Sequence, residues 1–204
     1  MKLIHEEILI GQSRVSPPLE VVACLSDIRS AISNVVWPER SRKFTIRPVI
    51  DGNGVLPIKV GFMRRLKALG WKLEERPVLA QGLGPGKVDA LKALADGRQF
   101  AAEWETGNIS SSHRALNKIC MGIIEGHLAG GVLILPDREL YRYLTQRIGN
   151  YKELAPYFPV YRHLESIEGL LAVFAVSFDQ ASDSVAFIPK GMDGHSLQRR
   201  ALKG

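Results

Sequence analysis

The sequence lacks the features that mark membrane and secreted proteins. No apolar run approaches the roughly 18 residues of a membrane-spanning helix, and charges interrupt the amino-terminal segment MKLIHEEILIGQ. The only two cysteines, Cys24 and Cys120, lie in apolar surroundings far apart in the sequence. Such a pattern favours buried thiols in a reducing compartment over a disulfide framework. We therefore expect a cytoplasmic protein without a membrane segment.

Internal repeats and low-complexity tracts are also absent, and the 204 residues predict one compact domain, 1–204, with a basic tail at about 195–204. Positive charge, in contrast, is in excess. The chain has 27 Lys and Arg against 21 Asp and Glu, a formal net charge of +6. This excess points to a polyanionic partner such as nucleic acid, although many housekeeping enzymes share it.

Hydrophobic periodicity indicates a mixed α/β fold. Apolar residues recur at helical spacing in four segments, at 18–36, 57–69, 112–128 and 138–150. Four further segments have the composition of strands, at 88–105 (a hairpin turning at ADGR), 131–136, 170–178 and 185–189. The order of these segments predicts a single-domain α/β protein with a central mixed β-sheet flanked by helices.

Three carboxylates are expected to meet on the predicted hairpin. Side chains alternate along a strand, so Glu103 and Glu105 share one face, and strand pairing brings Asp89 near them. A cation relieves the repulsion between such groups, and a site of carboxylate oxygens suits Mg²⁺ better than Zn²⁺. The competing interpretation is a solvated strand face, because Glu-x-Glu is common in strands.

Hydrogen-bonding residues follow the second glutamate and run into a helix start, where free N–H groups and the helix dipole favour phosphate. The segment TGNISSSHRALNK contains Asn108, Ser110, His113, Arg114, Asn117 and Lys118. The alternative is a capping sequence followed by a solvated helix face. Lys59 in VLPIK is either close to the carboxylates or DNA, or is a solvated helix lysine.

The sequence resembles the BamHI-type type II restriction endonucleases of the PD-(D/E)xK nuclease superfamily. The resemblance runs along nearly the whole chain and includes VWPERSRKFTI, NGVLPIK, GWKLEERP, EWETGNISSSHRALNK, YRYLTQRIGNYKELAPYF and IPKGMDG. The block that begins with the two glutamates is far more specific than a bare Asp…Glu-x-Glu pattern. The resemblance implies a restriction-endonuclease-like core and a homodimer that hydrolyses double-stranded DNA.

The resemblance implies that Asp89, Glu103 and Glu105 form the catalytic site, with Asp89 and Glu103 as metal ligands and one or two Mg²⁺ per site. The superfamily usually has lysine at the position of Glu105, whereas BamHI-type enzymes have glutamate there. Glu75 matches a further acidic residue of the site, and the adjacent Glu74 leaves that register open. The products would carry 5′-phosphates.

The resemblance also assigns residues that contact DNA, and Asn and Arg suit adenine and guanine edges respectively. These residues are Asn108, Ser110, Arg114, Gln146, Arg147, Asp193 and Gly194, and His113 is a candidate phosphate contact. Gln146 replaces the family's aspartate, which affects the outermost base pair. The implied target is a short palindrome with a GATC core, with GGATCC as the specific candidate.

A palindromic site requires a two-fold symmetric reader. The candidate dimer interface is the segment from Asn117 to Leu128, unless its apolar face only packs on its own sheet. Two other functional classes stay open: a catalytically inactive, sequence-specific DNA-binding protein, and a structure-selective nuclease of the same superfamily.

Overall fold

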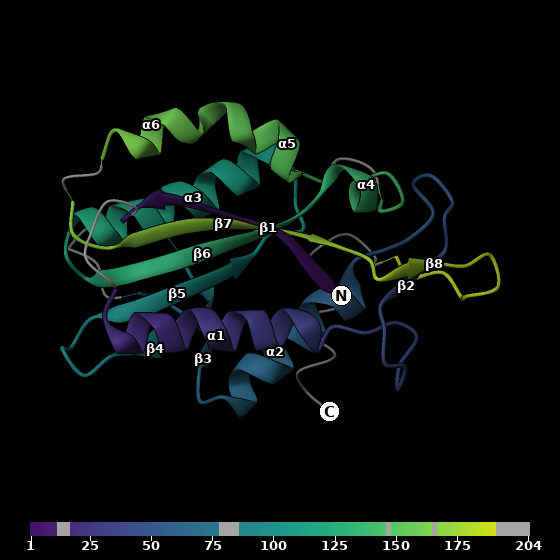
Figure 1. Ribbon diagram of the computed structural model, residues 1–204, viewed down its shortest axis with the longest axis horizontal. Coiled ribbons are helices and arrows are strands. Elements are labelled where there is room, and N and C mark those ends of the chain that lie inside the picture. The colour runs from purple at the N-terminus through teal and green to yellow at the C-terminus, as the bar shows by residue number, and fades with distance from the viewer. Residues whose placement is uncertain (12–16, 78–85, 146–147, 165–166, 191–204) are drawn as a thin grey trace.

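A six-stranded mixed sheet forms the centre of the molecule in a computed structural model (Figure 1), which describes residues 1–11, 17–77, 86–145, 148–164 and 167–190. The strand order is β1-β7-β6-β5-β4-β3. Strands β5, β6 and β7 are parallel, and the other neighbours are antiparallel. The strands are β1 (Lys2–Ile10), β3 (Lys72–Glu75), β4 (Val88–Ala93), β5 (Gln99–Trp104), β6 (Leu128–Pro136) and β7 (Leu170–Ser177).

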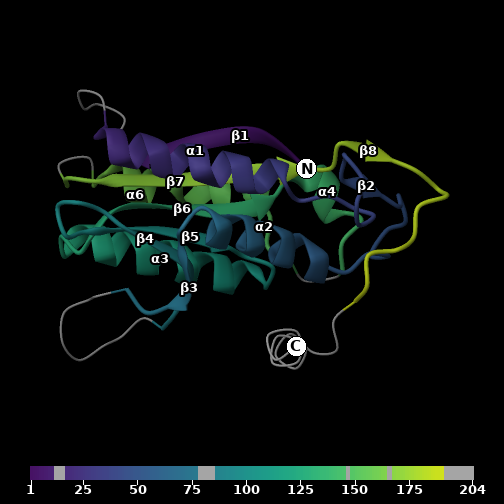
Figure 2. The ribbon, with the colours of Figure 1, turned by 90° about the horizontal axis from the view of Figure 1, so that it is seen from below.

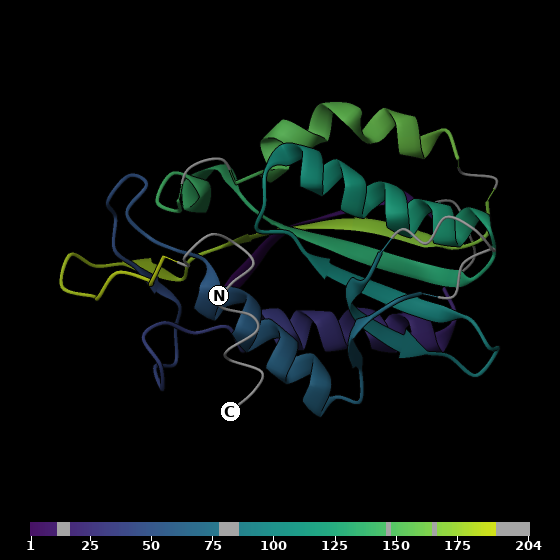
Figure 3. The same ribbon diagram turned by 180° about the vertical axis from the view of Figure 1, so that it is seen from behind.

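Helices cover both faces of this sheet (Figures 1 and 3). One face packs against α1 (Leu19–Ser33) and α2 (Leu56–Ala68). The other packs against α3 (Ile109–Ile124), α5 (Tyr151–Leu154), the 3₁₀ helix η1 (Ala155–Tyr157) and α6 (Phe158–Arg162). The buried apolar side chains accordingly form two clusters, one on each side of the sheet. The sheet is thus held between two hydrophobic layers, and every residue of β6 and β7 is buried.

A small projection extends from one end of the sheet (Figure 2). It contains the parallel pair β2 (Thr45–Ile46) and β8 (Gln180–Ala181), and α4 (Arg138–Tyr141) lies at its base. Asn53 is buried and anchors this region, because its amide donates to the carbonyl oxygens of Arg47 and Tyr143 and accepts from the N–H of Ile188.

The structure confirms the mixed sheet flanked by helices. The hairpin turn forms at ADGR as predicted, with Gly97 at φ 86° and the N–H of Leu94 donating to the carbonyl of Arg98 at 2.9 Å. Both Cys24 and Cys120 are buried, free thiols. Within the described ranges, no helix has the length and apolar character needed to cross a bilayer.

Two predicted elements are wrong. Segment 185–189 is not a strand, because the backbone of Ile188 bonds instead to the Asn53 side chain and to the N–H of Gly54. The helix predicted over 138–150 is only the short α4, since Leu144 forms a bridge with Asn53 and Asn150 caps the separate helix α5.

Four strands were not predicted, and two of them, β2 and β8, have only two residues each. Strand β1 has an edge position with a mostly exposed or half-exposed pattern, and β3 has only four residues, so neither shows a clear alternation of apolar residues.

Candidate active site

The pairing of β4 with β5 brings Asp89 and Glu103 together. Ala90 pairs with Ala102, which places Asp89 opposite Glu103 one position further along the ladder. The N–H of Asp89 donates to Glu103 Oε2 at 3.2 Å, and the N–H of Trp104 donates to Asp89 Oδ2 at 2.9 Å. Both carboxylates are buried, with 5% and 7% of the respective residues exposed. The two carboxylates are therefore held in a fixed arrangement inside the sheet. Their burial contradicts the interpretation of this strand face as solvated.

Strand β3 adds a third carboxylate to this row, and it belongs to Glu74. Leu73 pairs with Ala90 and Glu75 with Val88, so Glu74 falls opposite Asp89. Glu74 is half-buried and has a left-handed backbone, at φ 54°, whereas Glu75 is exposed. The structure thus brings Glu74 to Asp89 and Glu103, and leaves Glu75, the residue selected from the sequence, facing solvent.

Glu105 lies just beyond the end of β5. Its N–H donates to the carbonyl of Ile134, and its Oε1 accepts from the N–H of Gly107 at 2.6 Å. The side chain of Glu105 is half-buried. Among the described residues, no group of three or more His, Cys, Asp or Glu side chains is arranged to hold a metal ion. The buried pair of Asp89 and Glu103 nevertheless fits Mg²⁺, which is commonly bound through one or two carboxylates plus water and substrate phosphate.

Two lysines neutralise the buried pair. Lys59 Nζ, from the first turn of α2, lies 2.7 Å from Asp89 Oδ1. Lys118 Nζ, from α3, lies 2.5 Å from Glu103 Oε1 and also donates to the carbonyl of Lys87. Lys59 therefore lies close to the carboxylates, which is one of the two positions predicted for it from the sequence, and is not a solvated helix lysine. The direct contact of Lys118 was not foreseen, because its position could be inferred only once α3 was placed against β5.

Burial and charge perturb the pKa values of these groups. Burial, reinforced by repulsion from Asp89, raises the pKa of Glu103 to about 7, even though Lys118 counteracts the shift. The same two causes raise the pKa of Glu74. Burial alone would lower the pKa of Lys59, but the charge and hydrogen bond of Asp89 outweigh it, and the pKa is raised. The raised pKa values thus favour the charged form of Lys59 and the protonated form of Glu103.

The amino-terminal turn of α3 lies next to the carboxylates and carries several predicted DNA contacts. Asn108 is the N-cap, with its Oδ1 accepting from the N–H of Ser111 at 3.0 Å. The helix consequently starts at Ile109, three residues earlier than predicted. Asn108, Ser110 and Arg114 are exposed. His113, in contrast, is half-buried against Tyr157, with ring centroids 4.5 Å apart.

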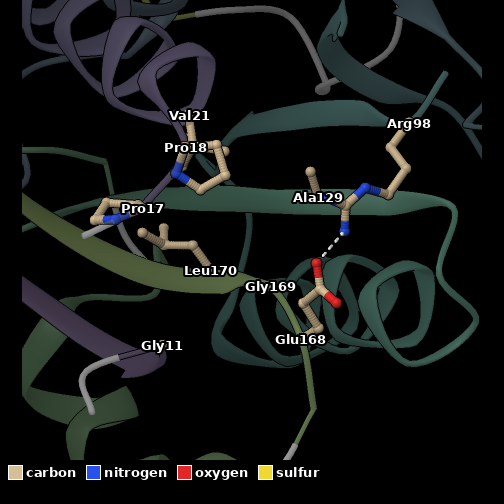
Figure 4. Close-up of a pocket in the computed structure, with 9 residues that line it drawn as sticks. All are labelled: Gly11, Pro17, Pro18, Val21, Arg98, Ala129, Glu168, Gly169 and Leu170. Carbon is tan, nitrogen blue, oxygen red and sulfur yellow. Dashed lines mark hydrogen bonds and ion pairs between the residues drawn. The ribbon is translucent and has the colours of Figure 1, made fainter. Parts of the chain in front are cut away.

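Four predicted DNA contacts, Gln146, Arg147, Asp193 and Gly194, lie outside the described residues. A pocket near the opposite end of β5 contains none of the predicted site residues (Figure 4). An ion pair between Arg98 and Glu168, 3.4 Å apart, crosses it. Its lining consists of Gly11, Pro17, Pro18, Val21, Arg98, Ala129, Glu168, Gly169 and Leu170.

Comparison with known proteins places the chain in the class of restriction endonucleases. The model of the family described as restriction endonuclease BamHI matches residues 1–195. The chain belongs to this BamHI family. The type II restriction enzyme OkrAI of Oceanobacter kriegii is 46% identical over 198 residues, covering 97% of this chain and 100% of that enzyme. The type II restriction enzyme BamHI of Bacillus amyloliquefaciens is 33% identical over 187 residues, covering 87% and 84%.

Among solved structures, restriction endonuclease BglII complexed with a DNA 16-mer matches with a TM-score of 0.46 and 10% identity. That match covers 65% of this chain and 66% of the BglII chain.

Proposed function

We propose that this protein is a cytoplasmic, homodimeric type II deoxyribonuclease that hydrolyses double-stranded DNA at a palindrome with a GATC core, GGATCC being the specific candidate. The reaction depends on Mg²⁺ and leaves 5′-phosphates. The observation that carries the proposal is the buried pair of Asp89 and Glu103 beside the amino terminus of α3. Membership of the BamHI family supports the reaction class.

In the proposed mechanism, Asp89 and Glu103 hold the metal. When bound, Mg²⁺ supplies charge that polarises the scissile phosphate and lowers the pKa of a bound water. Glu105 orients or deprotonates the attacking water from the end of β5, and Glu74 adds negative charge opposite Asp89. The hydrophobic layers on both sides of the sheet fix these positions, so the carboxylates need little rearrangement.

For recognition, we propose that Asn108, Ser110 and Arg114 read base edges in the major groove. Their exposure on the first turns of α3 leaves them accessible to DNA. Gln146 and Arg147 are proposed to contact the outer base pair, and Asp193 and Gly194 to approach the minor groove. His113 packs against Tyr157, which favours a structural contact over the proposed phosphate contact.

We propose that the dimer forms through a helical face made by Met121, Ile124, Tyr157 and Val160. Each of these side chains is 41% to 64% exposed. Helix α3 carries Met121 and Ile124, η1 carries Tyr157 and α6 carries Val160. Helices α3 and α6 are linked, because Tyr161 Oη donates to Asn117 Oδ1 at 2.7 Å. The inner side of α3 packs on the sheet, and its outer side exposes apolar groups, so the proposed interface uses the outer side.

Digestion of phage DNA with purified protein, with Mg²⁺ present or replaced by Ca²⁺, tests the function. We expect discrete fragments with Mg²⁺ whose sequenced ends lie within GGATCC and carry 5′-phosphates. Ends with a GATC core and another outer pair would assign the difference to Gln146 and Arg147. Specific binding without cleavage under any divalent metal would favour the inactive DNA-binding alternative, and cutting confined to branched DNA would favour a structure-selective nuclease.

Glu74 and Glu75 form a matched pair for testing the third carboxylate. Because Glu74 faces Asp89 and Glu75 faces solvent, we expect Glu74→Gln to lower the single-turnover cleavage rate at least about tenfold. We expect Glu75→Gln to stay within about twofold of wild type. Single-turnover cleavage of a short duplex measures both. The reverse ranking would assign the role to Glu75.

A further inference from the structure

The two lysines at the carboxylate pair occupy particular oxygen atoms. Asp89 Oδ2 and Glu103 Oε2 already accept backbone N–H groups, from Trp104 and Asp89 respectively. The remaining oxygens, Asp89 Oδ1 and Glu103 Oε1, are the ones in contact with Lys59 and Lys118. Each carboxylate is therefore divided into one oxygen fixed by the sheet and one oxygen paired with a helix lysine.

The lysine-paired oxygens are also the ones that a divalent cation would need. A hard cation seeks the carboxylate oxygen that is not engaged by the backbone, and an ammonium group at 2.5–2.7 Å excludes it from that direction. The two lysines come from opposite faces of the sheet, α2 on one side and α3 on the other. Both oxygens of the pair are consequently blocked by independent elements.

We propose that Lys59 and Lys118 compete with the metal for the two carboxylates. The metal must displace both ammonium groups to bind, and this requirement lowers its affinity for the site. This inference rests on the proposed metal-dependent nuclease function and concerns how its site is regulated. Both lysines can leave without losing every partner. Lys118 keeps the carbonyl of Lys87, 2.6 Å from its Nζ, and the Lys59 side chain is 23% exposed and can reach solvent.

DNA provides a further partner for the displaced lysines. A phosphate group attracts the same ammonium groups that the carboxylates hold, so DNA binding and metal binding favour each other. The coupling is reciprocal, because whatever draws the lysines off the carboxylates lowers the cost of metal entry. Metal affinity without DNA is then held low by the protein's own side chains.

Calorimetric titration of the DNA-free protein with Ca²⁺ tests this competition without relying on cleavage. We expect Lys59→Met and Lys118→Met each to bind Ca²⁺ at least roughly fivefold more tightly than wild type. Lys59→Arg retains the ion pair and should stay near wild type. Lys87→Met is the matched control, since Lys87 is exposed, acts on Glu74 through its charge, and has no ion pair with Asp89 or Glu103 among the described contacts.

Repeating the titration with a bound, uncleaved duplex tests the coupling. In wild type the duplex should tighten Ca²⁺ binding, and this gain should shrink in both Met variants. Unchanged or weaker Ca²⁺ affinity in the folded variants, checked by circular dichroism, overturns the inference. This outcome at either Lys59 or Lys118 is sufficient to overturn it. If a Met variant does not fold, Lys59→Gln or Lys118→Gln takes its place.

Failure of the inference is distinguishable from failure of the proposed function. A wild-type protein that binds and cleaves with metal, together with lysine variants of unchanged Ca²⁺ affinity, rejects only the competition. A wild-type protein that shows neither metal binding nor cleavage rejects the function itself, and the inference with it.

Discussion

Replacing Glu103 by glutamine is expected to lower the DNA cleavage rate at least about thousandfold. The substitution keeps the shape of the side chain but removes a charge from the pair that we propose to hold the metal, and a metal's charge stabilisation amounts to several kcal/mol. Glu103 lies near the end of β5 and accepts from the N–H of Asp89, which holds its carboxylate beside Asp89. Single-turnover cleavage of a duplex containing GGATCC measures the loss, with specific binding in Ca²⁺ as the retained activity.

The same variant should be more stable than wild type, which separates a functional role from a structural one. The folded-state pKa of Glu103, about 7, exceeds its ordinary value of 4.5. Wild type therefore loses stability as the pH rises from about 4.5 to 7, because the folded protein must give up a proton that it binds more tightly than the unfolded chain does.

Glutamine removes this penalty, so its free energy of unfolding should exceed that of wild type by up to about 3 kcal/mol at pH 8. The difference should shrink toward zero near pH 4.5. Urea unfolding at the two pH values measures it. Loss of cleavage together with a lower stability at pH 8 would instead make Glu103 a structural residue.

Introducing charge on the helical face is expected to abolish dimer formation. The double variant Met121→Glu and Ile124→Glu would place two carboxylates from each subunit into the proposed interface, where they would be desolvated without partners. Because a single subunit can read only half of a palindrome, its affinity for the intact site should fall at least about a hundredfold. Sedimentation velocity measures the mass, and a gel-shift titration in Ca²⁺ measures the affinity.

A matched control is available on α1. Leu19 and Val22 are also exposed apolar residues on a helix surface, but α1 lies on the other side of the sheet. The double variant Leu19→Glu and Val22→Glu should leave both mass and affinity unchanged. A dimer that persists with charge on the helical face would move the interface elsewhere on the molecule.

The hairpin of the candidate active site was predictable because its signals are local. A turn sequence and two short runs of strand-forming residues suffice to pair β4 with β5, and this pairing alone brings Asp89 to Glu103. Helix α3 was also predictable from local signals, although capping by Asn108 makes it begin at Ile109, earlier than predicted. Family resemblance added the proposed role of each carboxylate, which spacing cannot provide.

The third carboxylate and the lysines depend on long-range contacts. Strand alternation does not select between Glu74 and Glu75, since the register of β3 against β4 and the left-handed backbone at Glu74 decide it. Lys59 and Lys118 reach the same site from helices on opposite faces of the sheet. No periodicity within either helix shows such a meeting, because it arises only when the layers are stacked.

Helix α3 has a geometric consequence for the kind of DNA that the proposed dimer can accept. Its 16 residues span about 24 Å and carry the proposed base-reading residues Ser110 and Arg114 on the first turns, Lys118 in the middle, and Met121 and Ile124 of the helical face near the last turn. In the proposed dimer, a single continuous helix thus fixes the distance between the two-fold axis and the bases. The distance between half-sites is set by helix length, so a spacer inserted at the centre of the palindrome could not be bridged by loop adjustment.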